Sequence, residues 1–163
     1  MNTARLTLKP WCHNDADLLH RMWTEPQVRK YLWDDLLISR ETAIEVVNEC
    51  VGRAFQSGIG MWNVWTREAA VFAGFCGLRP IPDSADIEIY YGLRPEFWGR
   101  GYATEASRAV LEWRFRHGPE IRIYARSDPQ NLASIRVMER LGMTFLGEEQ
   151  QAGLRLLRYV MEK

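Results

Sequence analysis

The first third of the chain passes from a strand-like to a helix-like pattern of apolar residues. Residues 5–10 (RLTLKP) alternate apolar and polar side chains and predict a first strand. Apolar residues then recur at helical spacing over 14–23, and a short helix is predicted over 26–32. A longer helix is predicted between Ser39 and Gly58, because serine suits the start of a helix and glycine its end.

Strands and helices alternate through the rest of the chain. Short apolar runs bounded by turn residues predict strands, and runs with a 3.6-residue period predict helices. We expect an α/β (α+β) fold with a mixed sheet. The predicted strands cover 61–66, 70–78, 87–93, 121–127, 143–149 and 154–161, the predicted helices cover 102–116 and 131–142, and 79–86 is a predicted loop.

Length and charge narrow the classes of function. A chain of 163 residues fits a single domain, so 1–163 is predicted to be one domain. The net charge is zero, which argues against nucleic-acid or anionic-membrane partners. Cys12, Cys50 and Cys76 lie far apart without a C-x-x-C pair, so neither a disulfide framework nor a metal site is expected. The first residues hold no long apolar run, which predicts a cytoplasmic protein.

The stretch WGRGYATEA (98–106) places two glycines between a predicted strand and a predicted helix. Free N–H groups at a helix start bind anions, and glycines let a phosphate approach them closely. A tight turn with a helix cap explains the same residues. The stretch lacks the G-K-[ST] of a P-loop, and Thr104 stands where a dinucleotide-binding fingerprint has its last glycine.

The stretch PEFWGRGYATEA resembles the acyl-CoA-binding motif of the GCN5-related N-acetyltransferases (GNAT), in particular their RimJ/RimL branch. The family pattern Q/R-x-x-G-x-G/A reads Trp98, Gly101 and Ala103 here, with Trp98 in place of the usual Gln or Arg. RLTLKPW…ND near the start, EIYYGL before the turn and NLASIRVMERLGM near the end resemble the same branch in order and spacing.

The resemblance implies a fold and a co-substrate. The fold is a mixed, mostly antiparallel sheet of about seven strands, flanked by helices and splayed between the fourth and fifth strands. The co-substrate is acetyl-CoA. Its pantetheine arm would contact backbone groups of Tyr91 and Leu93 on one side and Asn131 and Ser134 on the other. Its pyrophosphate would be held by the amides of Trp98, Gly99, Arg100, Gly101, Tyr102, Ala103 and Thr104.

Catalytic roles follow from the same resemblance. Glu88 is the candidate base that takes the proton of the amine, and a one-residue bulge in its strand would bring Asp86 or a water chain forward instead. Many members carry a tyrosine acid where this chain has Met138. Ser134 is therefore the candidate acid, although its hydroxyl could equally bond its own helix, and the thiolate could leave unprotonated.

The acceptor is expected along the wall that contains YLWDD (31–35), with Trp33, Asp34 and Tyr90 as contacts. These aromatic residues could also be ordinary packing residues. The expected activity is N-acetyl transfer from acetyl-CoA to a primary amine, on a protein N-terminus or a small molecule. The alternatives are transfer of another acyl group and a catalytically weak CoA-binding module. A homodimer is common in such families and is possible here.

Overall fold

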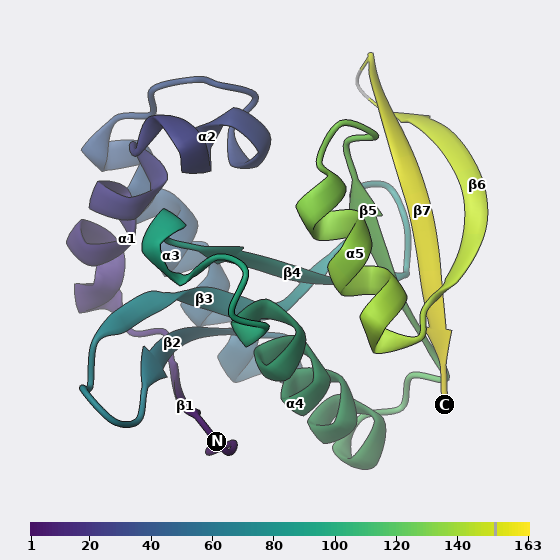
Figure 1. Ribbon diagram of the computed structural model, residues 1–163, viewed down its shortest axis with the longest axis horizontal. Coiled ribbons are helices and arrows are strands. Elements are labelled where there is room, and N and C mark those ends of the chain that lie inside the picture. Colours follow the sequence, from purple (N-terminus) through teal and green to yellow (C-terminus); the bar gives the residue numbers. More distant parts are fainter. Residues whose placement is uncertain (152) are drawn as a thin grey trace.

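The computed structural model describes residues 1–151 and 153–163. Seven strands form one mixed sheet in the order β1-β2-β3-β4-β5-β7-β6 (Figure 1). Only β4 and β5 run parallel, and the other neighbouring strands are antiparallel, as predicted. The strands are β1 (Leu6–Pro10), β2 (Met61–Thr66), β3 (Phe72–Pro80), β4 (Ile87–Leu93), β5 (Arg122–Ser127), β6 (Thr144–Gln151) and β7 (Leu154–Glu162).

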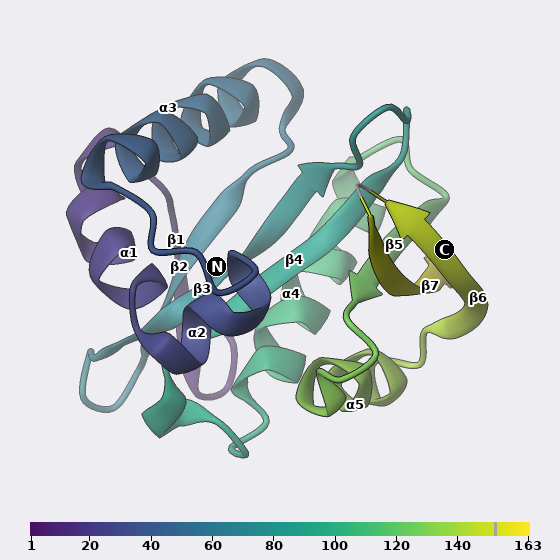
Figure 2. The same ribbon diagram turned by 90° about the horizontal axis from the view of Figure 1, so that it is seen from above.

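Helices cover both faces of the sheet. In the view from above, the first three helices lie on one side of β1–β4, and the last two lie on the other side (Figure 2). Ser39 caps the third helix as predicted, since its Oγ accepts the Thr42 N–H at 3.1 Å, and Gly58 ends that helix with φ 69°. The helices are α1 (Ala16–Trp23), α2 (Pro26–Leu32), α3 (Arg40–Ser57), α4 (Tyr102–His117) and α5 (Leu132–Leu141).

The sheet separates two hydrophobic cores. One lies between the sheet and α1–α3, where Trp11, Trp23 and Phe75 pack with ring centroids 5.8–6.1 Å apart. The other lies beneath α4 and α5 and contains Leu111 and Met138, both at most 1% exposed. Successive residues of an inner strand therefore face different cores. Two side chains of β4 can take part in the same site only if they lie on the same face.

β4 and β5 part almost as soon as they meet. Their parallel pairing consists of the single pair Glu88 and Tyr124, whereas β3 and β4 pair regularly from Gly74–Leu93 to Pro80–Ile87. The splay between the fourth and fifth strands is thus confirmed. The one-residue bulge expected in β4 is absent from its described pairing with β3, so successive β4 residues alternate strictly between the two faces.

The predicted loop over 79–86 begins too early. Arg79 and Pro80 extend β3, and they pair with Glu88 and Ile87. Pro80 is the last residue of its strand, where a missing N–H removes little from the ladder. Proline indicated a loop in the sequence, but here it marks the end of the strand.

Candidate active site

The glycine turn between β4 and α4 adopts a backbone that favours glycine. Gly99 and Gly101 have φ of 73° and 77°, and Gly101 is the N-cap residue of α4. A Cβ on Gly99 would meet nothing within 4 Å, and one on Gly101 would lie 3.5 Å from Arg5 Nη2. The positive φ, rather than crowding by neighbouring atoms, therefore explains why glycine is favoured at both positions.

The turn exposes a run of free backbone donors. Within the described residues, the six consecutive N–H groups from Gly99 to Thr104 donate to no acceptor, and the first amide bonded into α4 is that of Glu105, at 3.0 Å from Gly101 O. The Trp98 amide differs from the prediction, because it donates to Pro95 O at 3.1 Å. The Thr104 hydroxyl is buried and likewise has no partner. Such a concave row of donors at a helix N-terminus suits a phosphate group.

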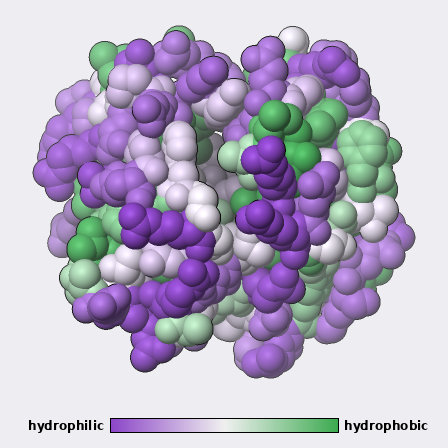
Figure 3. Space-filling model, in the orientation of Figure 1, coloured by the Kyte–Doolittle hydropathy of each residue, from purple (hydrophilic) through white to green (hydrophobic). Residues whose placement is uncertain are grey.

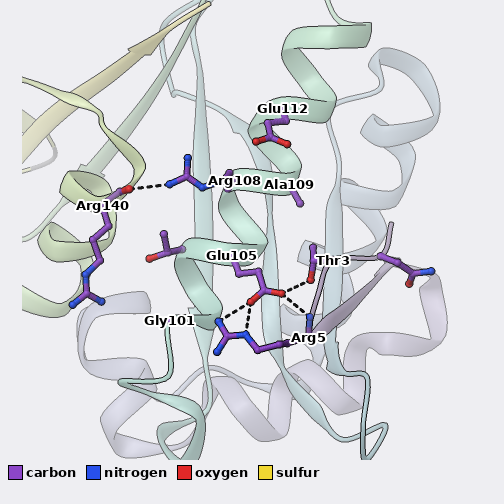
Figure 4. Close-up of a pocket in the computed structure, with 10 residues that line it drawn as sticks. Thr3, Arg5, Gly101, Glu105, Arg108, Ala109, Glu112 and Arg140 are labelled. Atoms are coloured by element: carbon purple, nitrogen blue, oxygen red, sulfur yellow. Dashed lines mark hydrogen bonds and ion pairs between the residues drawn. The ribbon is translucent and has the colours of Figure 1, made fainter.

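The N-terminal arm holds this turn from outside. Arg5 Nη1 donates to Arg100 O at 2.9 Å. Arg5 Nε donates to Glu105 at 2.7 Å (Figure 4). The Thr3 hydroxyl and the Arg5 amide donate to the other Glu105 oxygen. Arg5 and Glu105 border an open depression of about 530 Å³ along the first turns of α4. The arm therefore fixes the turn without using its free amides.

Glu105 gives this anchor a pH dependence. Burial opposes its ionisation, but the bonds from Thr3 and Arg5 outweigh that effect and hold its pKa below the ordinary 4.5. Glu105→Gln is expected to lower the free energy of unfolding by about 1–2 kcal/mol at neutral pH. A lowered pKa means that the stabilisation is complete above 4.5 and lost as the pH falls through the folded value.

Urea denaturation at neutral pH and at about pH 3 measures this difference. Glu112→Gln is the matched control, because Glu112 is exposed on the same helix and forms no ion pair among the described residues. If the free energies of unfolding of Glu105→Gln and the parent protein differ as much at the acid pH as at neutral pH, the ionised Glu105 is not the source of the stabilisation.

The opposite border of the splay is formed by the start of α5. Asn131 caps this helix, and its Oδ1 accepts the Ser134 N–H at 3.1 Å. Ser134 Oγ lies 2.9 Å from the Tyr91 hydroxyl, which comes from β4. The structure thus brings together three residues predicted to border the acyl arm. Leu93 lies at the end of β4, and its carbonyl accepts the Trp98 indole N–H at 2.7 Å.

Glu88 lies on the other face of β4, buried in an ion-pair cluster. It is 1% exposed, and its oxygens accept from Arg79 Nε at 2.7 Å and from Arg126 Nε and Nη2 at 2.7 and 3.0 Å. Arg126 also pairs with Glu149 at 3.1 Å. The two predicted catalytic residues, Glu88 and Ser134, are therefore not brought together. An amine proton would have to reach oxygens that already accept from two guanidinium groups.

Two of the predicted acceptor residues, Trp33 and Asp34, follow α2, and the third, Tyr90, lies on β4. Figure 3 shows the surface hollowed between its two halves, above the region where β4 and β5 part in Figure 1. Asp34 is exposed with φ 51° and forms no ion pair among the described residues. Trp33 packs edge-on against Trp23 at 5.5 Å, which favours the packing alternative for that ring.

Tyr90 lies between Arg79 and the end of α2. The Arg79 guanidinium stacks 3.5 Å from the centre of the Tyr90 ring, and the Tyr90 hydroxyl lies 3.5 Å from Leu32 O. Burial raises the pKa of Tyr90, although the charge of Arg79 opposes this shift, so the hydroxyl stays protonated. Across the hollow, the Tyr31 hydroxyl reaches Gln130 O at 3.4 Å.

Sequence reasoning did not identify Arg79, Arg126 or the Tyr91 hydroxyl. Arg126 lies in the largely buried strand β5, and an arginine at such a position indicates that a buried carboxylate pairs with it. The sequence does not reveal that carboxylate, because Glu88 lies on another strand. Among the described residues, no group of three or more acidic, histidine or cysteine side chains could hold a metal. In the same residues, every helix is too short or too polar to cross a bilayer.

Comparison with known proteins gives a consistent result. Residues 5–144 match the family of acetyltransferase (GNAT) domains. The uncharacterized N-acetyltransferase p20 of Bacillus licheniformis is 29% identical over 144 residues, which cover 85% of this chain and 79% of p20.

Two solved structures show the same fold at low sequence identity. The acetyltransferase of Agrobacterium tumefaciens C58 superimposes with a TM-score of 0.87 at 23% identity, over 100% of this chain and 94% of that one. RimL, the ribosomal L7/L12 α-N-protein acetyltransferase in complex with coenzyme A, gives a TM-score of 0.83 at 21% identity, over 98% and 95% of the two chains.

Proposed function

Because the chain belongs to the GNAT acetyltransferase family, we propose that it moves an acetyl group from acetyl-CoA to a primary amine by direct attack in a ternary complex. Acetyl-CoA supplies the activated acyl group when bound. The six free amides from Gly99 to Thr104 carry the proposal, since a pyrophosphate would satisfy donors that no described residue satisfies.

The pantetheine arm is proposed to lie in the splay between β4 and β5. Parallel pairing ends at Glu88 and Tyr124, so the backbone groups of β4 beyond Glu88 have no strand partner on the β5 side within the described residues. Backbone groups of Tyr91 and Leu93 would bond the arm there, and a β4 N–H would stabilise the oxyanion that forms on attack. Asn131 and Ser134 border the same space from α5.

The amine must lose a proton to attack or as it attacks. Glu88 was the predicted base, but its burial and its two arginine partners favour the water route, which the sequence also allowed. We therefore assign the proton to water in the hollow. Ser134 is proposed to donate its hydroxyl hydrogen toward the leaving sulfur.

A cationic amine is the proposed acceptor. Asp34 presents an exposed carboxylate that pairs with none of the described residues, and its charge acts on the Tyr90 hydroxyl. Trp33 would contribute the apolar edge of the same wall. RimL acts on the α-amine of a ribosomal protein, and MccE, of TM-score 0.81, is a microcin C7 self-immunity acetyltransferase. A test of the acceptor should therefore include both peptide N-termini and small-molecule amines.

The proposal predicts that acetyl-CoA releases free thiol in the presence of a suitable amine from a panel of N-terminal peptides, amino acids, amino sugars and polyamines. In the same assay, Asp34→Asn should raise KM for the accepted amine about fivefold, because an exposed charge contact contributes at most about 1 kcal/mol. Asp35→Asn is the control, since Asp35 is also exposed but pairs with Arg29 at 2.8 Å.

Two outcomes would contradict the proposal. Acetyl-CoA binding without thiol release over the whole panel would favour the alternative of a catalytically weak CoA-binding module. Release from propionyl- or succinyl-CoA that greatly exceeds release from acetyl-CoA would favour transfer of another acyl group. Equal KM values for Asp34→Asn and Asp35→Asn would remove Asp34 from the acceptor site.

A further inference from the structure

Two hydroxyl groups meet across the splay, and the roles assigned so far use only one of them. The Tyr91 hydroxyl lies 2.9 Å from Ser134 Oγ and 3.2 Å from Ser134 O. Tyr91 extends from β4 toward the core beneath α4 and α5, and Ser134 lies in the first turn of α5. The pair therefore spans the same two borders between which the acyl arm is proposed to lie.

The hydrogen-bonding capacity of Ser134 limits what this pair can do. Its amide N–H already donates to Asn131 Oδ1 at 3.1 Å, which fixes the backbone of the residue. Burial raises the pKa of Tyr91, with the Ser134 bond opposing the shift, so Tyr91 keeps its proton at any working pH. A tyrosine that donates to Ser134 Oγ leaves the single hydrogen of the serine free to point elsewhere.

We propose that Tyr91 is a positioning residue whose hydroxyl donates to Ser134 Oγ and thereby turns the Ser134 hydrogen toward the thioester sulfur. This inference rests on the proposed acetyl transfer. As the new C–N bond forms and the C–S bond breaks, the sulfur takes the Ser134 proton. Ser134 regains a proton from the water that accepted the proton of the amine, and Tyr91 retains its own. A chain of two hydrogen bonds also makes the serine a better donor than it would be alone.

The chain offers no other tyrosine at the position that the family resemblance would lead one to expect. Many enzymes of the family that the chain resembles have a tyrosine that acts as the general acid at position 138. This chain has Met138 there, which is 0% exposed in the core. No hydroxyl can reach the sulfur from there. Tyr91 supplies a tyrosine hydroxyl from β4 instead, but acts through Ser134 rather than directly.

A purely structural role would have a different hydrogen-bond direction. If Tyr91 donated to Ser134 O at 3.2 Å, the Ser134 hydroxyl would donate back to Tyr91, and its hydrogen would point away from the sulfur. Tyr91 would then tie β4 to α5 and do no more. The two directions predict different kinetics for the same variants.

The experiment compares Tyr91→Phe, Ser134→Ala and the double variant in the thiol-release assay. For Tyr91→Phe we expect kcat to fall roughly tenfold, the scale of one hydrogen bond, while KM and Kd for acetyl-CoA stay within about twofold. The double variant should be no slower than Ser134→Ala, because Tyr91 acts only through Ser134. Tyr159→Phe is the control, a tyrosine 7% exposed in the same core whose hydroxyl bonds none of the described residues.

Thermal melting of each variant shows whether it is folded, and acetyl-CoA binding by the parent protein tests the proposed function separately. An unchanged kcat for Tyr91→Phe, or equal falls for Tyr91→Phe and Tyr159→Phe, would overturn the inference. A higher KM for acetyl-CoA at unchanged kcat would assign Tyr91 the structural role. Multiplicative effects in the double variant would show that Tyr91 does not act through Ser134.

Discussion

Replacing Gly101 with valine is expected to abolish acetyl-CoA binding, with Kd rising roughly 100-fold or more. Gly101 has φ 77°, a conformation that costs a side-chain residue about 1–2 kcal/mol and a β-branched one more. Relaxation of that strain would turn neighbouring amides of the 99–104 row away from the anion. Two charge-assisted hydrogen bonds at about 1.5 kcal/mol each account for the loss. Isothermal titration with acetyl-CoA measures it.

Gly142→Val is the matched control for this strain. Gly142 ends α5 with φ 82°, and a Cβ there would meet nothing within 4 Å, so the substitution carries a similar backbone cost away from the glycine turn. Both variants should lose similar thermal stability, but only Gly101→Val should lose binding. Equal acetyl-CoA affinities for the two variants would mean that the pyrophosphate lies elsewhere.

Glu88→Gln is expected to destabilise the protein and to leave the pH dependence of its rate unchanged. Glu88 is 1% exposed between Arg79 and Arg126, and Arg126 itself is only 5% exposed. Removal of one partner from a buried ion pair costs about 3 kcal/mol, since the remaining charges are left incompletely paired. Urea denaturation should show this loss, whereas the pH profile of kcat/KM should keep its shape.

Glu148→Gln provides the comparison for the ion pair. Glu148 pairs with Arg155 on the surface of β6 and β7, with both side chains about half exposed. The loss there should be much smaller than for Glu88→Gln, because solvent screens exposed pairs. If the pH profile of Glu88→Gln instead loses a limb that the parent protein shows, Glu88 is the base after all, and the water route is wrong.

The arrangement of helices and strands could be predicted from the sequence because it is encoded locally. Ser39 and Gly58 bound α3 as their capping chemistry indicates, and the glycines at 99 and 101 indicated the tight turn before α4, where both have positive φ. The family resemblance added the splay, and the single pair between Glu88 and Tyr124 confirmed it. Local pattern and resemblance together were sufficient for this part.

The fine structure of the site could not be predicted because it depends on partners far apart in sequence. Glu88 meets Arg126 across 38 residues, and Tyr91 meets Ser134 across 43. Strand alternation indicates which face of β4 a residue takes only when the register is known. The expected bulge obscured that register, and the regular pairing of β3 with β4 resolves it.

The single pair between β4 and β5 also bears on how the molecule opens in the native state. β5, α5, β6 and β7 follow one another along the chain. Among the described residues, Glu88–Tyr124 is the single backbone pair that joins their ladder to that of β1–β4. The remaining link is made by side chains such as Glu88 with Arg126 and Tyr91 with Ser134, so the two ladders are expected to exchange their amide hydrogens at different rates. A ligand seated between them would protect both at once, so an enzyme saturated with acetyl-CoA should unfold as one unit.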